Sequence, residues 1–511
     1  MLVAAVVAMP LVAVVWIAFS AADDSWRHVM TNVVPRATGR TIQLLLLTCL
    51  VTGAFGILTA WLVTTFDFPL RRLMSVILVL PLAIPSYLAA YAFGEFFDYT
   101  GPLQTGYRAL FGFQTSRDYW FPDIRSMGGA VLVLGSVLFP YVYLACRSTF
   151  LMQGRAAADV ARTLGAGPVK VFWKIQIPMA RPAIVIGLTL VMMETLNDIG
   201  AVEFLGVNTL TFSVYNTWLN RGSLAGAAQI ASVMFVIVGL LILLERLARR
   251  NQRFSSNKTT ASVNDMVRRH LRGWRALLAL VLCALPVISG FMVPVLVLGG
   301  FALRRIENYA DPRLVDALFN SIIVSSAAAL VAVALGFLLS YAARCDQSRG
   351  TLIAGRVASL GYGVPGTVLA IGVLIPLAGF DNALDGLLRS WFGISSGLLL
   401  SGTGFAIVYA CAVRFMTMAE GTLDAGFQKL SPHLDMAART LGRSRGETLR
   451  AVLLPNMRPA ILTAALLVFI ETMKELSATI LLRPFSFNTL ATLVYEDASR
   501  AKIEDSSVAA M

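Results

Sequence analysis

Long apolar stretches recur along the whole chain and are separated by short polar segments. An apolar run of about 20 residues is needed to cross the hydrocarbon core of a bilayer as a helix. The runs do not alternate between apolar and polar positions, which favours helices over the strands of a barrel. We expect a membrane-spanning helix at each of eleven stretches: residues 2–19, 41–65, 73–96, 128–150, 182–203, 226–247, 276–300, 316–343, 355–378, 398–419 and 459–482.

The composition supports an all-α polytopic membrane protein. Hydrophobic residues make up 57% of the chain and charged residues 14%, whereas a soluble domain carries roughly a quarter charged residues. The five cysteines are scattered and never form a C-x-x-C pair, so the sequence predicts neither a disulfide framework nor a zinc site. It contains no G-x-x-x-x-G-K-[ST] phosphate loop. We therefore expect no ATP hydrolysis, no enzymatic activity, no cofactor and no permanent metal in this chain.

The net charge of +13 is concentrated in polar segments, most densely in residues 246–275. Lys and Arg accumulate on cytoplasmic loops of membrane proteins, so we interpret residues 248–275 as a cytoplasmic basic linker. A nucleic-acid-binding or lipid-binding arm is the alternative, but the segment has only two aromatic residues, Phe254 and Trp274, too few to favour nucleic acid. Alternation of the helices from this linker places residues 151–181 and 421–458 in the cytoplasm as well.

An internal repeat extends through the chain. Residues 162–184 and 439–461 are identical at nine of 23 positions, and the interval from Gly to Pro is thirteen residues in both. Further matches, such as NTLTFSVY at 208–215 and NTLATLVY at 488–495, indicate two tandem modules of about six helices each.

The modules are expected at residues 1–247 and 276–511. Parallel repeats of this kind fit a pseudo-two-fold axis along the membrane normal. The second module ends at residues 506–511, where its sixth helix should begin. We expect that this helix has been truncated, and its real absence is the alternative.

The duplicated segment predicts two short helices joined by a glycine turn, with Gly165 and Gly442 in the left-handed conformation. The second short helix begins differently in the two copies. Gly167-Pro168 begins it in the first copy, and a capping box of Ser444 and Glu447 begins it in the second.

Prolines bound the end of each segment. We expect Pro178 and Pro455 to end the second short helix, and Pro182 and Pro459 to begin the next spanning helix.

Each short helix also carries an apolar pair spaced i, i+3 beside basic residues: Phe172 with Ile175, and Leu449 with Val452. One interpretation is a helix lying in the lipid interface. The other is a cytoplasmic knob that docks in a partner's groove through apolar anchors within a charged rim. The equal internal spacing of the two copies favours the second interpretation.

AARTLG at 437–442, followed by Leu454-Pro455, resembles the EAA loop of permease subunits of binding-protein-dependent ABC importers. The resemblance implies loops at 156–182 and 433–459 that act as coupling helices in clefts of an ATP-binding subunit. The acidic residue of the motif is Asp159 in the first copy, whereas the second copy has Met436 there and Asp435 one place earlier. The implied coupling residues are Asp159, Ala161, Arg162, Leu164, Gly165, Phe172, Ile175, Pro178, Asp435, Ala437, Ala438, Arg439, Leu441, Gly442, Leu449, Val452 and Pro455.

The whole chain is similar to ferric-iron importer permeases with two fused modules of the type I, MetI-like fold. This resemblance implies a multi-pass protein of the bacterial inner membrane that moves Fe³⁺ from periplasm to cytoplasm. Its implied partners are a homodimeric ATP-binding subunit, which binds ATP and Mg, and a periplasmic substrate-binding protein. Similar fused permeases carry thiamine, phosphonates or other solutes. A secondary transporter driven by an ion gradient, with Glu194 and Glu471 as cation sites, is the alternative of another class.

Charged residues within spanning segments are energetically unfavourable and are candidates for function. Oxygen ligands suit Fe³⁺ better than thiols do, and transient contacts would let the ion pass. The alternative is an ion-pair network between packed helices, in which Lys474 neutralises one carboxylate. The candidates for the translocation pathway are Glu194, Asn197, Asp198, Glu471, Lys474, Glu475, Glu95 and Tyr91.

Overall fold

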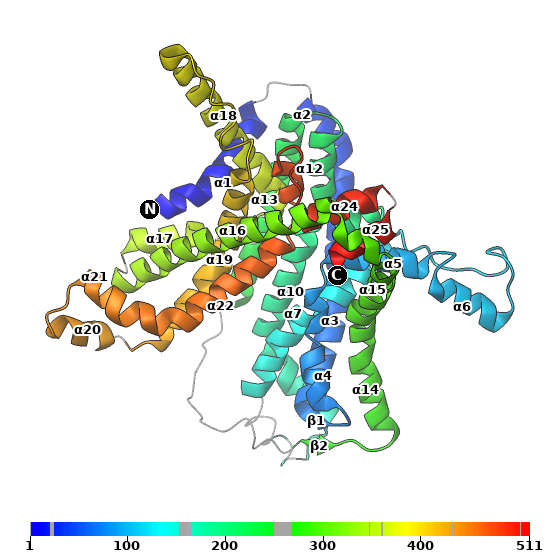
Figure 1. Cartoon of the computed structure of the whole chain (residues 1–511). Helices are drawn as coiled ribbons and strands as arrows, with labels where there is room; N and C mark the ends of the chain where they lie inside the picture. The colour runs from blue at the N-terminus through cyan, green and yellow to red at the C-terminus, as the bar shows by residue number, and fades with distance from the viewer. Residues whose placement is uncertain are drawn as a thin grey trace. The chain divides into compact units, whose positions relative to one another are not determined.

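The computed structural model describes residues 2–20, 25–152, 161, 163, 165–249, 268–346, 348–358, 361–431, 433–500 and 502–511. Most of these residues are helical (Figure 1). The only strands among them are β1 (Phe66–Asp67) and β2 (Arg269–His270), which form a short parallel pair.

The helical elements of the first half, in which η marks a π-helical or 3₁₀ turn, are α1 (Leu2–Ser20), α2 (Ser25–His28), η1 (Val29–Val33), α3 (Val34–Thr65), α4 (Arg71–Ile77), η2 (Leu80–Ala83), α5 (Ser86–Phe97), α6 (Pro102–Phe111), α7 (Met127–Met152), α9 (Pro168–Val171), η3 (Phe172–Gln176), α10 (Ile177–Asn197), α11 (Gly200–Phe204), α12 (Leu210–Leu219) and α13 (Leu224–Arg249).

Those of the second half are α14 (Trp274–Val287), η5 (Ile288–Met292), α15 (Val293–Arg304), η6 (Ile306–Ala310), α16 (Pro312–Cys345), α17 (Arg349–Ala358), η7 (Gly361–Gly363), α18 (Gly366–Phe392), α19 (Phe405–Lys429), α20 (His433–Thr440), α21 (Arg445–Thr448), η8 (Leu449–Leu453), α22 (Leu454–Met473), α23 (Thr479–Leu482), α24 (Leu490–Ser499) and α25 (Ile503–Ala510).

Ten helices among the described residues are long and apolar enough to cross a membrane, and a bent pair brings the number to eleven. Each overlaps one of the stretches expected from sequence, so the polytopic all-α prediction is confirmed. The third stretch, 73–96, is not one straight helix, because the segments Arg71–Ala83 and Ser86–Phe111 are bent by 95°.

The second copy breaks at the corresponding place, so residues 355–378 also do not form one helix. α17 ends at Ala358, and α18 begins after Pro365. Pro85 and Pro365 are the cap residues of α5 and α18, with similar backbone angles (φ −56°, ψ 140° and φ −57°, ψ 141°). A proline disfavours helical backbone at the residue before it, which explains why both copies interrupt the helix here.

The chain forms two compact units that differ from the two sequence modules. Unit 1 contains residues 1–31, 213–235 and 307–497, and unit 2 contains residues 32–212, 236–306 and 498–511. Within unit 1, the α1 helix of the first module packs on α17 and α18 of the second. Within unit 2, helices α14 and α15 of the second module pack on α3 and α5 of the first. The modules therefore exchange their first helices.

Each unit is built around the same three elements of the repeat. Helices α3, α7 and α10 pack together in unit 2, and α16, α19 and α22 pack together in unit 1. In both units, a side-chain hydroxyl on the first of these helices, α3 or α16, also accepts a hydrogen bond from a backbone N–H. Leu210 N–H donates to Thr41 Oγ1 at 2.9 Å, and Leu490 N–H donates to Ser321 Oγ at 2.8 Å. The repeat is thus preserved in its contacts.

Helix α1 is held in unit 1 by a contact at its proline. Pro10 has no N–H, so it cannot donate to the carbonyl of Val6 one turn earlier. The hydroxyl of Tyr409 on α19 donates to that carbonyl oxygen at 2.5 Å. A Cβ at Gly372 on α18 would lie 2.1 Å from the Pro10 oxygen, so glycine permits this close approach.

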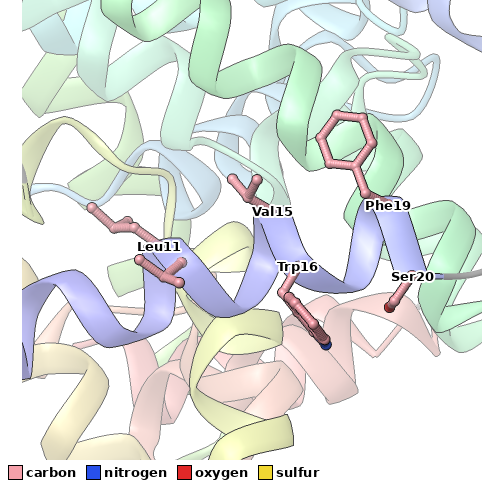
Figure 2. A pocket seen from close by; sticks show the side chains of 6 residues that line it. Leu11, Val15, Trp16, Phe19 and Ser20 are labelled. Atoms are coloured by element: carbon pink, nitrogen blue, oxygen red, sulfur yellow. The ribbon is translucent and has the colours of Figure 1, made fainter.

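Another part of the α1 surface is apolar and open. Leu11, Val12, Val15, Trp16, Phe19 and Ser20 line a shallow hollow there (Figure 2). The side chains of Trp16 and Phe19 are both 74% exposed. Exposed side chains of this type are expected on a helix that faces lipid.

Candidate coupling loops and intramembrane charges

The second-copy loop consists of two short helices that meet at Gly442. Gly442 has φ of 82°, and the glycine turn predicted from sequence is confirmed. Helix α21 follows with the predicted capping box. Glu447 N–H donates to Ser444 Oγ at 3.3 Å, and Ser444 N–H donates to Glu447 Oε2 at 2.8 Å.

The first-copy loop reaches the same backbone geometry with different residues. Gly165 has φ of 83°. Gly167 caps α9 with φ −68° and ψ 159°, close to the φ −69° and ψ 164° of Ser444. Three predicted coupling residues of this copy, Asp159, Arg162 and Leu164, lie outside the described residues.

The prediction that Pro178 and Pro455 end the second short helix is wrong. The π-helical turns η3 and η8 connect each loop helix directly to the spanning helix α10 or α22. The N–H of Ile177 donates to the carbonyl of Phe172 five residues earlier, and that of Leu454 donates to Leu449. A π turn changes the hydrogen-bond register just before a proline, which has no N–H to give. Loop and span are therefore continuous.

The exposed apolar side chains of the first loop are not those expected from the i, i+3 spacing. Phe172 is buried, and its ring lies 4.5 Å from that of Trp61 on α3. Ile175 is half-buried. Val169 and Trp173 are 58% and 64% exposed, and they lie four residues apart, on one side of a helix.

The second loop exposes a different set. Leu449 and Val452 are half-buried, whereas Leu441 and Met436 are 83% and 62% exposed. Ala438 is buried. The remaining second-copy candidates are also located: Ala437 and Pro455 are exposed, Asp435 is half-buried, and the side chain of Arg439 lies outside the described residues. The two loops share a backbone shape but present different apolar surfaces.

Asp198 caps a short helix inside unit 2. Its Oδ1 accepts from the N–H of Ala201 at 2.8 Å and from that of Val202 at 3.3 Å, at the start of α11. Its Oδ2 accepts from the hydroxyl of Ser86, the first residue of α5. The carboxylate is buried, as is its neighbour Asn197. Asp198 therefore links the start of α5 to the start of α11 through hydrogen bonds.

Glu475 is the corresponding cap in unit 1. Its carboxylate accepts from the N–H of Ala478 at 2.9 Å and from that of Thr479 at 3.0 Å, at the start of α23. It also accepts from Nη1 of Arg414 at 2.7 Å, and the two side chains are only 1% and 7% exposed. The position equivalent to Ser86 is Gly366, where a Cβ would lie 2.9 Å from Glu475 Oε1 and 3.0 Å from Arg414 Nη1.

Arg414 is a site residue that was not among the candidates predicted from the sequence. The available signal was that Arg414 is the one basic residue in the apolar stretch 398–419. A charged side chain within the membrane needs a partner of opposite charge, so a single arginine in this stretch predicts a nearby carboxylate.

The other intramembrane candidates occupy separate places. Glu471 and Lys474 form an ion pair with a distance of 2.9 Å between Oε1 and Nζ, so Lys474 does neutralise one carboxylate, but within one chain segment and not between packed helices. Glu194 and Glu95 are half-buried. Tyr91 is buried, with its ring 4.9 Å from Phe204. These contacts make Lys474 a structural partner of Glu471.

Comparison with known proteins decides the family. The model of the family described as binding-protein-dependent transport system inner membrane component matches twice, at residues 53–253 and 332–495. The chain belongs to this family. It is therefore an ABC importer permease, a transport subunit located in the inner membrane with multiple spans.

The permease is similar to relatives that differ in substrate. It is 26% identical over 466 residues to the Fe(3+)-transport system permease protein FbpB 2 of Haemophilus influenzae, with 90% of this chain and 84% of the relative covered. It is 28% identical to the molybdenum transport system permease protein ModB of Escherichia coli, covering 43% of this chain and 92% of the relative. The sulfate transport system permease protein CysT of Salmonella typhimurium is 26% identical, with 42% and 77% covered.

Proposed function

We propose that the permease moves Fe³⁺ from the periplasm to the cytoplasm. The observation that carries this proposal is the extent of similarity to the ferric-iron relative, which covers both modules and 90% of the chain. The molybdenum and sulfate relatives match less than half of the chain. A periplasmic binding protein would deliver the ion at the outer face.

The energy comes from a separate homodimeric ATP-binding subunit, which binds ATP and Mg. Each coupling loop docks in one cleft of that dimer. Continuity of α9 with α10, and of α21 with α22, supports this proposal, because a helix transmits a displacement of its end along its length. The exposed side chains Val169, Trp173, Met436 and Leu441 are suitable apolar anchors.

Within the membrane, Asp198 and Glu475 position helices rather than bind the ion, because their oxygens already accept several hydrogen bonds. Glu194 and Glu471 lie one turn earlier in the chain and supply transient oxygen contacts to the passing cation, with Glu471 leaving its ion pair with Lys474 for that contact. A permanent site would retain the ion.

Reconstituted vesicles that contain the permease, its ATP-binding subunit and its binding protein test this function. We expect uptake of Fe³⁺ that requires ATP and the ATP-binding subunit and is unaffected by excess sulfate or molybdate. Uptake of an oxyanion in place of Fe³⁺ would refute the substrate. Uptake that needs no ATP-binding subunit and stops when the ion gradient is collapsed would establish the secondary-transport alternative.

The docking role has its own test in the same vesicles. Gly165→Val and Gly442→Val place a branched side chain where φ is positive, at a cost of about 1–2 kcal/mol per site. We expect both variants to insert in the membrane but to lose ATP-driven uptake. Gly239→Val is the matched control, because a Cβ at Gly239 has no neighbour within 4 Å and its φ is not positive. Full uptake in both loop variants would contradict docking through these loops.

A further inference from the structure

Arg344, in the last turn of α16, connects the second coupling loop to two membrane helices. Its Nε donates to Oδ2 of Asp435 in α20 at 2.8 Å. The side chains of Arg344 and Asp435 are 14% and 32% exposed, so water only partly screens this ion pair. The two residues are 91 positions apart in the chain, so the contact is a product of the tertiary fold.

The same guanidinium also binds the end of α19. Nη1 of Arg344 donates to the carbonyl oxygen of Phe427 at 2.9 Å, and Nη2 donates to that of Ser431 at 3.3 Å. The last carbonyls of a helix have no partner within the helix, and a cation stabilises that end. The guanidinium carbon also lies 5.6 Å from the centre of the Phe427 ring. One planar group with five donors is thus shared between α19 and α20.

The first copy has no equivalent arginine. In the register of the repeat, Thr64 takes the place of Arg344, and its hydroxyl donates to the carbonyl of Ala60 in its own helix at 2.7 Å. Among the residues that the structure describes, this link is thus seen in the second loop, and the first copy has no arginine at the same register to form it.

We propose that Arg344 is a positioning residue that fixes the angle of α20 to α16 and α19. Asp435 is then an internal ligand of the loop and not a contact for the ATP-binding subunit. A displacement of α20 is passed to both membrane helices through this guanidinium, in addition to the path through η8 and α22. This proposal rests on the docking function proposed above.

Spin-label distances in the full-length permease alone test the positioning. Thr440 and Ala425 are exposed positions on α20 and α19, so Thr440→Cys with Ala425→Cys reports the angle between these helices. Cys345 is exposed and is replaced by Ser in every sample. We expect a narrow distance distribution in this background, a broad one with Arg344→Gln, and an intermediate one with Asp435→Asn, which keeps the carbonyl contacts.

Arg313→Gln is the matched control. Arg313 lies at the other end of α16 and pairs with Asp311 at 3.0 Å on the surface, with 64% of its side chain exposed. Surface pairs of this kind contribute little, so we expect the narrow distribution to remain. A narrow distribution in Arg344→Gln as well would overturn the proposal.

Transport per ATP hydrolysed tests the consequence. We expect Arg344→Gln to lower the uptake per ATP on the order of tenfold, within the range of typical coupling energies, while the ATP-binding subunit still co-purifies. Arg344→Lys keeps the charge without the planar fork and should recover part of the loss. Unchanged uptake per ATP in a variant with a broadened distribution would refute the role in coupling. A wild-type permease that fails to bind the ATP-binding subunit would instead refute docking, while the spin labels would still decide whether Arg344 positions the loop.

Discussion

At the residue scale, the two copies differ in how they satisfy a buried carboxylate. A short helix inside the membrane domain begins beside a buried carboxylate, Asp198 or Glu475. Asp198 receives a serine hydroxyl, whereas Glu475 receives an arginine that fits because the serine position is Gly366. Val137 lies the same distance before the loop glycine as Arg414 does, and it is apolar. The first copy therefore holds the corresponding carboxylate with a neutral serine hydroxyl and without the arginine of the Arg414–Glu475 pair.

Replacing the second copy's arrangement by that of the first copy tests whether the two are equivalent. Arg414→Val alone leaves the carboxylate of Glu475 buried without its cation, and we expect a loss of about 3–5 kcal/mol in stability. The triple variant Arg414→Val, Gly366→Ser, Glu475→Asp copies the first module's arrangement and should recover most of the loss. The measurement is denaturant unfolding of the permease in detergent.

Gly366→Ser alone serves as the control. The added side chain would lie 2.9 Å from Glu475 Oε1 while Arg414 is still present, so we expect this variant to be destabilised. A triple variant no more stable than Arg414→Val would show that the two arrangements are not interchangeable.

At the element scale, the caps of α9 and α21 create one backbone geometry from two sequences. Gly167-Pro168 restricts the backbone directly, because proline fixes φ near the helical value. Ser444 and Glu447 satisfy the free N–H groups by side-chain hydrogen bonds. The second solution depends on side chains that a substitution can remove.

Ser444→Ala should loosen the start of α21. Loss of a serine cap costs about 1 kcal/mol, so we expect amides of residues 445–448 to exchange with deuterium several times faster. Thr440→Ala is the control, because the Thr440 hydroxyl donates to the carbonyl of Ala437 within its own helix, α20. Equal exchange in wild type and Ser444→Ala would mean that packing alone holds this turn.

At the scale of the whole molecule, the exchange of first helices makes each compact unit depend on both sequence modules. Unit 1 needs α1 from the first module, and unit 2 needs α14 and α15 from the second. The relative ModB matches less than half of this chain over 92% of its own length. A permease module can thus exist as a separate polypeptide in this family.

Separate modules should therefore assemble when they are produced together. If the chain is divided within residues 250–267, which lie outside the described part, we expect the two fragments to co-purify as a complex with equal amounts of each. Each fragment alone should aggregate or be degraded, because surface that is buried in the units would be exposed. Stable, separately folded fragments would contradict the exchange. The Tyr409→Phe variant should weaken the complex, because the Val6 carbonyl would lose its donor.

The spans, the repeat, the glycine turns and the capping box of this permease can all be predicted from its amino-acid sequence. Each of these depends on residues close together in the chain or on a simple apolar period, so the pattern is visible without the fold. The breaks before Pro85 and Pro365 also follow from a local rule, because a proline disfavours helical backbone at the residue before it, although the apolar runs predict an unbroken helix at each place.

The contacts between side chains that are distant in the sequence depend on the tertiary fold. It paired Arg414 with Glu475 and Arg344 with Asp435, buried Phe172 against Trp61 and exposed Trp173 instead. A helical period gives the relative direction of side chains but not which direction is covered, because this depends on helices that are distant in the sequence. The exchange of first helices also depends on the tertiary fold. The apolar surfaces that α1, α14 and α15 cover have no sequence pattern that selects one spanning helix over another.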